Sequence, residues 1–247
     1  FMEKTSLLLK LYTFALFSVF IMCSCSNVNY ENTDYLHKVL DNLNQIKSVN
    51  YYKYVESYSP GDTTPLFGAS IYVKEYDNPS DTTIGASFIV LQPEDTTKMK
   101  WCYDGKMKAR VNREKKYFEI DSFKNDTLPF RPVSSPFFNY TTSIIKYALE
   151  TKDSISIDIN DLGESVRLRV KIFNDKQVEF FGKPFYLDSP YGLEEEISKY
   201  EIWINKSNNL PYKVNREMSH DRSVNTITDI NKINKDSETD FNASDYF

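Results

Sequence analysis

Two segments of the chain repeat apolar residues at steps of three and four. The apolar positions of the first segment, residues 34–47, are Leu36, Val39, Leu40, Leu43 and Ile46. Such spacing places them on one face of a helix, for which Thr33 or Asp34 is the expected cap. Residues 136–151 have a similar spacing, and Pro136 suits a first helical turn because a proline lacks the N–H that would have no partner there. The pattern therefore predicts two amphipathic helices.

Most of the remaining chain alternates apolar and polar residues with a period of two, as residues 166–172 do without a fault. This period is typical of strands with one buried and one solvated face. Turn sequences such as Asp104-Gly105 separate the segments and favour antiparallel hairpins. The predicted strands are residues 49–58, 67–76, 84–91, 98–103, 107–112, 117–122, 154–160, 166–172, 178–186, 200–205, 212–218 and 224–233.

These elements predict a mainly β (α+β) fold. Because two helices must each bury a stripe against one long antiparallel meander, we expect a strongly curved sheet, a half-open barrel, with both helices packed in its concavity. The 18 Tyr and 17 Phe of the chain supply large apolar surfaces for its core. The length suits a single domain, residues 34–247.

The N-terminus carries an export pattern. Residues 1–24 combine a short charged start with an apolar run, and Ser24 precedes Cys25, as in the signal peptide of a bacterial lipoprotein. We expect Cys25 to be lipidated, residues 25–33 to be a tether, and the protein to be held at the cell envelope, facing the periplasm or the cell surface. The alternative is an uncleaved helix that spans the membrane, for which the apolar run is short.

Charge and cysteine content narrow the function. The net charge is −5 and becomes more negative once the signal leaves, which disfavours nucleic-acid binding. After Cys25, the mature chain keeps only Cys102, for which we expect a packed thiol and no disulfide. No Cys-x-x-Cys is present, so dithiol chemistry is not expected of this segment. His37 and His220 are too far apart in sequence to predict a zinc site, and no phosphate-cradling glycine spacing occurs. No cofactor is expected.

Three segments carry a resemblance to a known family. They are the end of the first helix with the start of the first strand, and two hairpins: residues 46–52, 101–106 and 200–213. Together they resemble the LolA/LolB-like lipoprotein-carrier fold, an unclosed barrel with helices as a lid, and this resemblance implies binding of acyl chains. A second set is similar to the N-terminal region of envelope proteins that continue into a TlpA/thioredoxin-type reductase domain: residues 60–62, 84–88, 129–133, 137–140 and 241–247.

The resemblance leaves two functional classes open. The first is a non-catalytic, membrane-tethered module that serves a C-terminal thioredoxin-like domain or another redox partner, with the chain cut after Phe247. The second is a stand-alone carrier or sensor of acyl chains or other apolar ligands. A downstream Cys-x-x-Cys would favour the first class, and a stop codon after Phe247 the second.

A ligand cavity would be lined by apolar strand positions and by the two helices. The candidates are Leu40, Leu43, Met99, Trp101, Tyr103, Ile145, Leu149, Leu168, Val170 and Trp203. The alternative is that they fill the core completely, since protein interiors pack densely. Lys106, Lys108 and Arg110 alternate with apolar residues and suit either an anionic-lipid patch or, as we expect, a solvated outer face.

Overall fold

The structure is a computed structural model that describes residues 30–81, 85–112, 117–121, 136–151, 155–173, 176–178, 184–186, 197–218 and 222–236. The chain divides into two compact units, Phe1–Asp34 and Tyr35–Phe247. The predicted signal peptide, Cys25 and His220 lie outside the described residues.

Two helices and thirteen strands are described. The helices are α2 (Tyr30–Asn44) and α3 (Phe137–Glu150). The first six strands are β1 (Ser48–Tyr58), β2 (Phe67–Asp77), β3 (Ala86–Gln92), β4 (Asp95–Tyr103), β5 (Lys108–Asn112) and β6 (Tyr117–Asp121). The others are β7 (Ile155–Asp161), β8 (Ser165–Ile172), β9 (Lys176–Val178), β10 (Pro184–Tyr186), β11 (Ser198–Asn205), β12 (Leu210–Glu217) and β13 (Arg222–Ile233).

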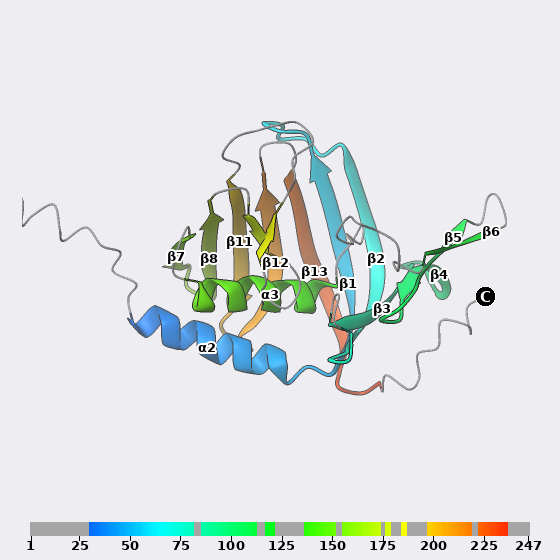
Figure 1. Ribbon diagram of the computed structural model, residues 1–247, viewed down its shortest axis with the longest axis horizontal. Helices are drawn as coiled ribbons and strands as arrows, with labels where there is room; N and C mark the ends of the chain where they lie inside the picture. The colour runs from blue at the N-terminus through cyan, green and yellow to red at the C-terminus, as the bar shows by residue number, and fades with distance from the viewer. Residues whose placement is uncertain are drawn as a thin grey trace, which may run out of the picture. The chain divides into compact units, whose positions relative to one another are not determined.

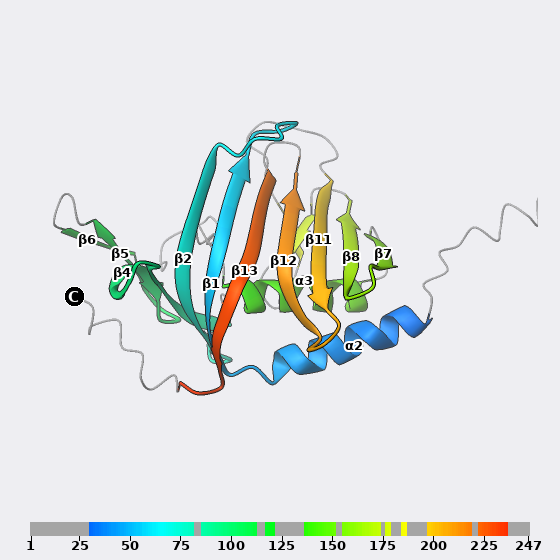
Figure 2. The ribbon, with the colours of Figure 1, turned by 180° about the vertical axis from the view of Figure 1, so that it is seen from behind.

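Eleven strands form one curved antiparallel sheet in the order β6-β5-β4-β3-β2-β1-β13-β12-β11-β8-β7. Helix α3 crosses in front of β11, β12 and β13 (Figure 1) and lies behind them in the reverse view (Figure 2). Strands β4 to β6 turn away from the direction of the other strands at one end of the sheet. The prediction of a mainly β fold, with a curved open sheet and two helices, is confirmed.

The connectivity differs from the single meander that the sequence predicts. Strand β1 pairs with β13, and the chain between β6 and β7 carries α3 from one edge of the sheet to the other. Residues 178–186, predicted as one strand, contribute instead to β9 and β10, which pair only with each other. Thr33 and Asp34, the expected cap, lie inside α2. Pairing between distant segments leaves no periodic trace in the sequence.

The sheet has apolar side chains on both faces. One cluster, here called the helix-side cluster, joins residues of both helices to alternate strand positions such as Phe88 and Val90. The intervening positions, Ile89 and Leu91, belong to a smaller outer cluster, because successive side chains of a strand point to opposite faces. The other members of the outer cluster are Tyr72, Met99, Cys102 and Ala109.

A β-bulge in β4 decides which residues join each cluster. Val90 lies opposite Trp101, whereas Leu91 lies opposite Met99, so Lys100 is the extra residue. A bulge shifts the alternation by one position. Trp101 therefore belongs to the helix-side cluster and Met99 to the outer one, although two residues apart in an unbroken strand they would share a face.

Candidate functional site

The N-terminus of α3 is fixed by a carboxylate on a distant strand. Glu75 of β2 accepts hydrogen bonds from the backbone N–H of Phe138 (3.2 Å) and Asn139 (2.6 Å) and from the hydroxyl of Tyr51 (2.7 Å). The Tyr51 oxygen accepts the N–H of Phe137 at 2.8 Å. Three of the first N–H groups of α3 thus have acceptors, although Pro136 offers no side-chain cap. An anion at this end also complements the helix dipole.

Burial changes the protonation equilibria around this cap. Glu75 is buried, and desolvation raises its pKa above the usual range, although the three hydrogen bonds and Lys53 act in the opposite direction. Lys53, buried on β1, has a pKa lowered to about 8 because burial disfavours the ammonium, an effect that the charge of Glu75 reduces. A buried cation and a buried carboxylate therefore lie near the start of α3.

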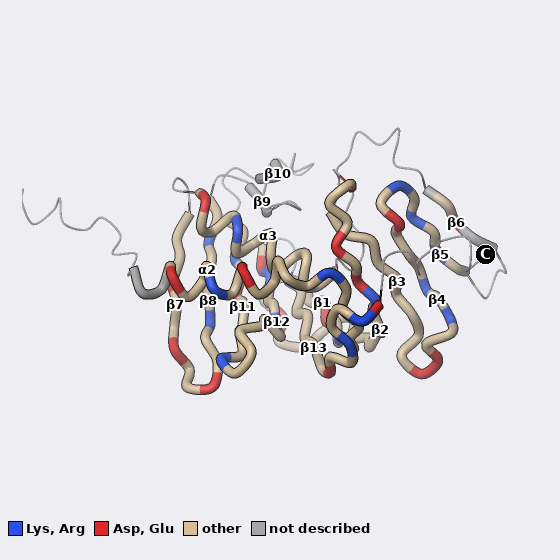
Figure 3. Tube along the Cα trace, turned by 90° about the horizontal axis from the view of Figure 1, so that it is seen from below, with Lys and Arg blue, Asp and Glu red and all other residues tan. Residues whose placement is uncertain are grey.

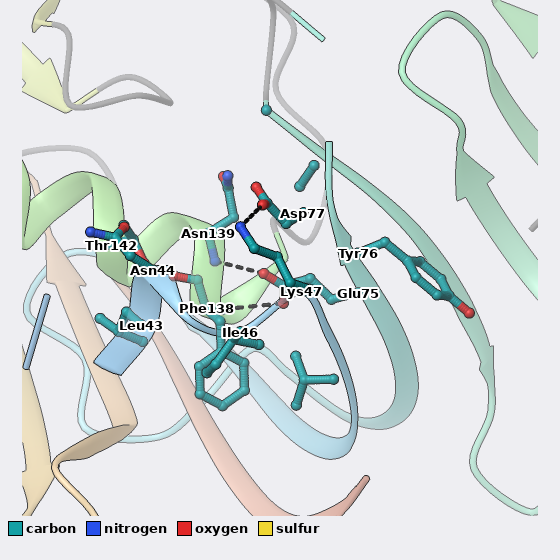
Figure 4. Close-up of a pocket in the computed structure, with 13 residues that line it drawn as sticks. Leu43, Asn44, Ile46, Lys47, Glu75, Tyr76, Asp77, Phe138, Asn139 and Thr142 are labelled. Carbon is teal, nitrogen blue, oxygen red and sulfur yellow. Dashed lines mark hydrogen bonds and ion pairs between the residues drawn. The ribbon is translucent and has the colours of Figure 1, made fainter. Parts of the chain in front are cut away.

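A polar pocket of about 320 Å³ lies beside this cap. Figure 4 shows Glu75 bonded to Phe138 and Asn139, and Lys47 paired with Asp77, along its wall. The Lys47 ammonium lies 2.6 Å from the Asp77 carboxylate. Because both carboxylates of the pocket already serve the fold, we assign it a structural role.

A second pocket, of about 380 Å³, lies among β1, β2, β4 and β5. We call it the apolar pocket. Its lining is Val55, Phe67, Ala69, Ile71, Lys100, Trp101, Lys108, Arg110 and Val111. Ile71 and Trp101 are members of the helix-side cluster and Val55 packs against it, so the pocket adjoins the core. Its volume falls within the range of about 300–1,000 Å³ that is usual for ligand sites.

Strand pairing brings cations to this apolar pocket. Arg110 lies opposite Trp101, and Lys108 lies opposite Tyr103, so these pairs share a face of the sheet. The Lys108 ammonium is 5.7 Å from the centroid of the Trp101 ring, a favourable cation–π distance. Arg110 is exposed and Lys108 is partly exposed, as the expected solvated face requires. This face, however, is the one that carries the helix-side cluster and not the outer face of the sheet. Lys106 precedes β5 and is exposed.

Exposed apolar residues border the pocket on the side of the β1–β2 hairpin. Phe67, which lines the pocket, is 58% exposed, and its neighbour Leu66 is 72% exposed. Phe67, Ala69 and Ile71 alternate along β2 on one face. The pocket is therefore continuous with apolar surface that solvent reaches.

The sequence-predicted cavity residues separate into three groups. Trp101 lines the apolar pocket and Leu43 lines the polar one. Met99 lies in the outer cluster because of the bulge, and Trp203 lies on the face opposite Ile202 and Ile204, with the Lys213 ammonium 4.9 Å from its ring centroid. The remaining candidates pack in or against the helix-side cluster: Leu40, Tyr103, Ile145, Leu149, Leu168 and Val170.

Most residues of the apolar pocket were not candidates from the sequence. The alternation of Lys108 and Arg110 with apolar residues was visible, but it does not say which face is solvated. The missing information is the register between β4 and β5, which places Arg110 beside Trp101. The bulge at Lys100 is equally invisible to a period-two pattern.

Other chemistry is sparse in the described part of the chain. Cys102 is buried, and burial raises its pKa to about 11, which favours the unreactive thiol and fits the expected packed role. Among the described residues, no group of three or more His, Cys, Asp or Glu side chains could hold a metal ion. Neither described helix is long and apolar enough to cross a membrane.

Comparisons with known proteins place the chain near no family by sequence. No protein-family model matches it, and no curated protein matches it. Lipoprotein LppX from Mycobacterium tuberculosis is 10% identical, with 84% of this chain and 97% of that chain covered and a TM-score of 0.40. LprF from Mycobacterium bovis is 10% identical, with 82% and 93% covered and a TM-score of 0.42.

A LolA superfamily protein from Nitrosomonas europaea is 11% identical, with 86% of this chain and 99% of that chain covered and a TM-score of 0.33. TM-scores below 0.5 give these overlaps no weight in assigning a ligand. The site must therefore be understood from its own geometry.

Proposed function

We propose that this chain is a membrane-anchored envelope lipoprotein that binds an apolar ligand, without catalysing a reaction, in the apolar pocket. The observation that carries the proposal is an open space of about 380 Å³ with mainly apolar walls, next to a core of buried residues. An apolar pocket with a few polar groups is the usual form of a small-molecule site.

The position of the pocket supports reversible binding. Phe67 is 58% exposed at its margin, so a ligand can enter along the β1–β2 side without opening the packed helix-side cluster. The walls come from two pairs of neighbouring strands of one sheet, β1–β2 and β4–β5, with β3 between the pairs, so backbone pairing fixes their positions. A pre-formed site of this kind favours binding because little order must be created when the ligand arrives.

Fluorescence of Trp101 tests the proposal. The chain has two tryptophans, so Trp203→Phe leaves Trp101, which lines the pocket, as the only reporter. Titration of this variant with 1-dodecanol, a probe with an uncharged head, should give a saturable change in emission. Absence of any saturable change at micromolar probe would contradict the proposal.

Two neighbouring substitutions on β2 provide a matched pair. Ala69→Phe fills the pocket and should abolish the emission change, because Ala69 lines it. Ser70→Phe adds the same ring at an exposed position on the other face of the strand and should leave binding intact. Both variants are compared by circular dichroism melts, so that loss of the fold is distinguished from loss of binding. Equal binding by both would place the ligand elsewhere.

The finer hypothesis, a module that serves a thioredoxin-like reductase domain, rests on the sequence resemblance alone. It predicts that a protein containing this chain continues past Phe247 into a segment with a Cys-x-x-Cys. Reading the coding sequence beyond Phe247 tests this hypothesis directly, and a stop codon there would refute it. Ligand binding in the apolar pocket is independent of the result.

A further inference from the structure

Three cations surround the apolar pocket. Lys100, Lys108 and Arg110 all line it. Figure 3 shows basic residues along β4 and β5. Lys100 reaches the pocket because it is the bulged residue of β4, and the other two are placed by alternation along β5. Two unrelated features of the backbone therefore bring positive charge to one apolar site.

The negative charges nearby are fewer. No acidic side chain is among the described residues that line the pocket. Glu119 lies opposite Arg110 on β6 and is exposed, so it offsets part of the positive charge on this face. Lys53, opposite Ile71 on β1, interacts electrostatically with Glu75, so these two buried charges offset each other. Cations therefore outnumber carboxylates among the described residues that line the pocket.

The volume limits the size of the ligand. A cavity of about 150 Å³ suffices to hold benzene in an engineered protein, so about 380 Å³ suits one alkyl chain rather than two or more. Its open side, at Phe67 and Leu66, leaves room for part of a chain to lie on the surface. A ligand with one chain and a small head matches these dimensions.

We propose that the apolar pocket selects single-chain amphiphiles with an anionic head, such as a long-chain fatty acid, whose head is held by Lys100, Lys108 and Arg110. The inference deepens the proposed function and rests on it. The alkyl chain lies against Val55, Ala69, Ile71 and Trp101. Arg110 contributes a planar fork of donors that matches a carboxylate, and the lysines contribute point charges.

Three probes of equal chain length separate charge from apolar contact. The Trp203→Phe chain is titrated at pH 8 with dodecanoate, 1-dodecanol and dodecyltrimethylammonium, each below its micellar concentration, and Trp101 emission is followed. Dodecanoate should bind at least about tenfold more tightly than dodecanol, because one hydrogen bond to a charged group commonly contributes that factor. The cationic probe should bind most weakly. The preference for dodecanoate should decrease with added salt.

Substitutions locate the head group. Arg110→Gln should weaken dodecanoate binding about tenfold and leave dodecanol binding unchanged. Lys98→Gln is the matched control. It removes from the neighbouring strand β4 a cation that is paired with Asp95 and does not line the pocket. The Lys108→Glu, Arg110→Glu double variant should prefer dodecyltrimethylammonium. Its binding of that probe also demonstrates that the pocket is still folded.

The outcomes distinguish the two proposals. If dodecanol binds as tightly as dodecanoate and Arg110→Gln affects both alike, the anionic preference is overturned while apolar binding stands. If no probe binds, both proposals fail. Titration with dodecyl phosphate tests which head group the site prefers. Affinity equal to that for dodecanoate supports a site for any small anion, and affinity about tenfold weaker supports a carboxylate site.

Discussion

Replacement of Glu75 tests how the curved sheet holds α3. In Glu75→Ala, the N–H groups of Phe138 and Asn139 and the hydroxyl of Tyr51 lose their acceptor. A buried donor without a partner costs about 1–3 kcal/mol, and loss of an anion from a helix N-terminus costs up to about 2 kcal/mol more when it is partly buried. The change therefore acts on both the sheet and the helix.

Two effects make the expected loss of stability smaller than the sum of these costs. Desolvation raises the pKa of Glu75, so removal of the carboxyl also removes an unfavourable burial. The polar pocket beside it, about 320 Å³ in volume, can admit water to the exposed donors. Taking the lower limit of about 1 kcal/mol for each of the three donors, we expect the free energy of unfolding to fall by about 3 kcal/mol. For a chain of this length that lowers Tm by about 6–12 °C.

The assay is urea unfolding of the full chain followed by circular dichroism, with hydrogen exchange of α3 as a local readout. The amides of Phe138 and Asn139 should lose protection before those of β12. Glu75→Gln keeps one acceptor oxygen and should lose less stability than Glu75→Ala. Glu217→Ala removes an exposed carboxylate that lies 2.7 Å from the Lys199 ammonium and should cost less than about 1 kcal/mol.

A double-mutant cycle isolates the interaction. Tyr51→Phe removes the hydroxyl that donates to Glu75 and accepts from Phe137, so its effect should not add to that of Glu75→Ala. If Glu75→Ala lowers the free energy of unfolding by no more than Glu217→Ala does, the carboxylate does not fix α3 and the reasoning is refuted.

Four further predictions concern separate parts of the chain. Cells fed a labelled fatty acid should label the chain but not its Cys25→Ala variant, and a labelled variant would exclude Cys25 as the anchor site. Cys102, whose pKa is raised to about 11 by burial, should react with a thiol reagent at pH 8 only after denaturation; rapid reaction of the native chain would show that it is accessible. Lys53 has a folded pKa of about 8 against 10.5 for a free lysine, so the unfolded state binds more protons above pH 8 and stability should rise from pH 8 to 9.5. The urea midpoint of Lys53→Met should not rise over this range. If the midpoint of the variant rises as much as that of the original chain, another group causes the rise. Gly105→Ala should lower Tm, because φ is 91° there and an added Cβ would lie 2.6 Å from the Asn78 amide nitrogen; an unchanged melt would mean that the turn adjusts without cost.

The elements of the fold follow from local patterns. Steps of three and four in residues 136–151 predict α3, which the structure places at Phe137–Glu150. Unbroken alternation in residues 166–172 predicts β8 and correctly separates buried Leu168 and Val170 from the less buried Arg167 and Arg169. Helical and extended backbones repeat their side-chain directions at fixed periods. The type of such a segment and its buried face can therefore be predicted without the rest of the chain.

The apolar pocket depends on information that is not periodic. Lys100 reaches it through a bulge, and Arg110 reaches it through the register of β4 with β5. The period of β5 shows that Lys108 and Arg110 share a face, but either face of a strand can be the solvated one until its neighbours are known.

The cap of α3 depends on contact between distant segments. Residues 75 and 138 are 63 positions apart in the chain, and the N-cap residue, Pro136, makes no side-chain capping hydrogen bond. The sequence by itself determined most of the secondary structure, the curved β class and the export pattern, because these depend on residue types and their local spacing. Only the tertiary structure decided that β1 pairs with β13, that Glu75 meets α3, and that three cations surround an apolar space, because each depends on which distant strands lie side by side.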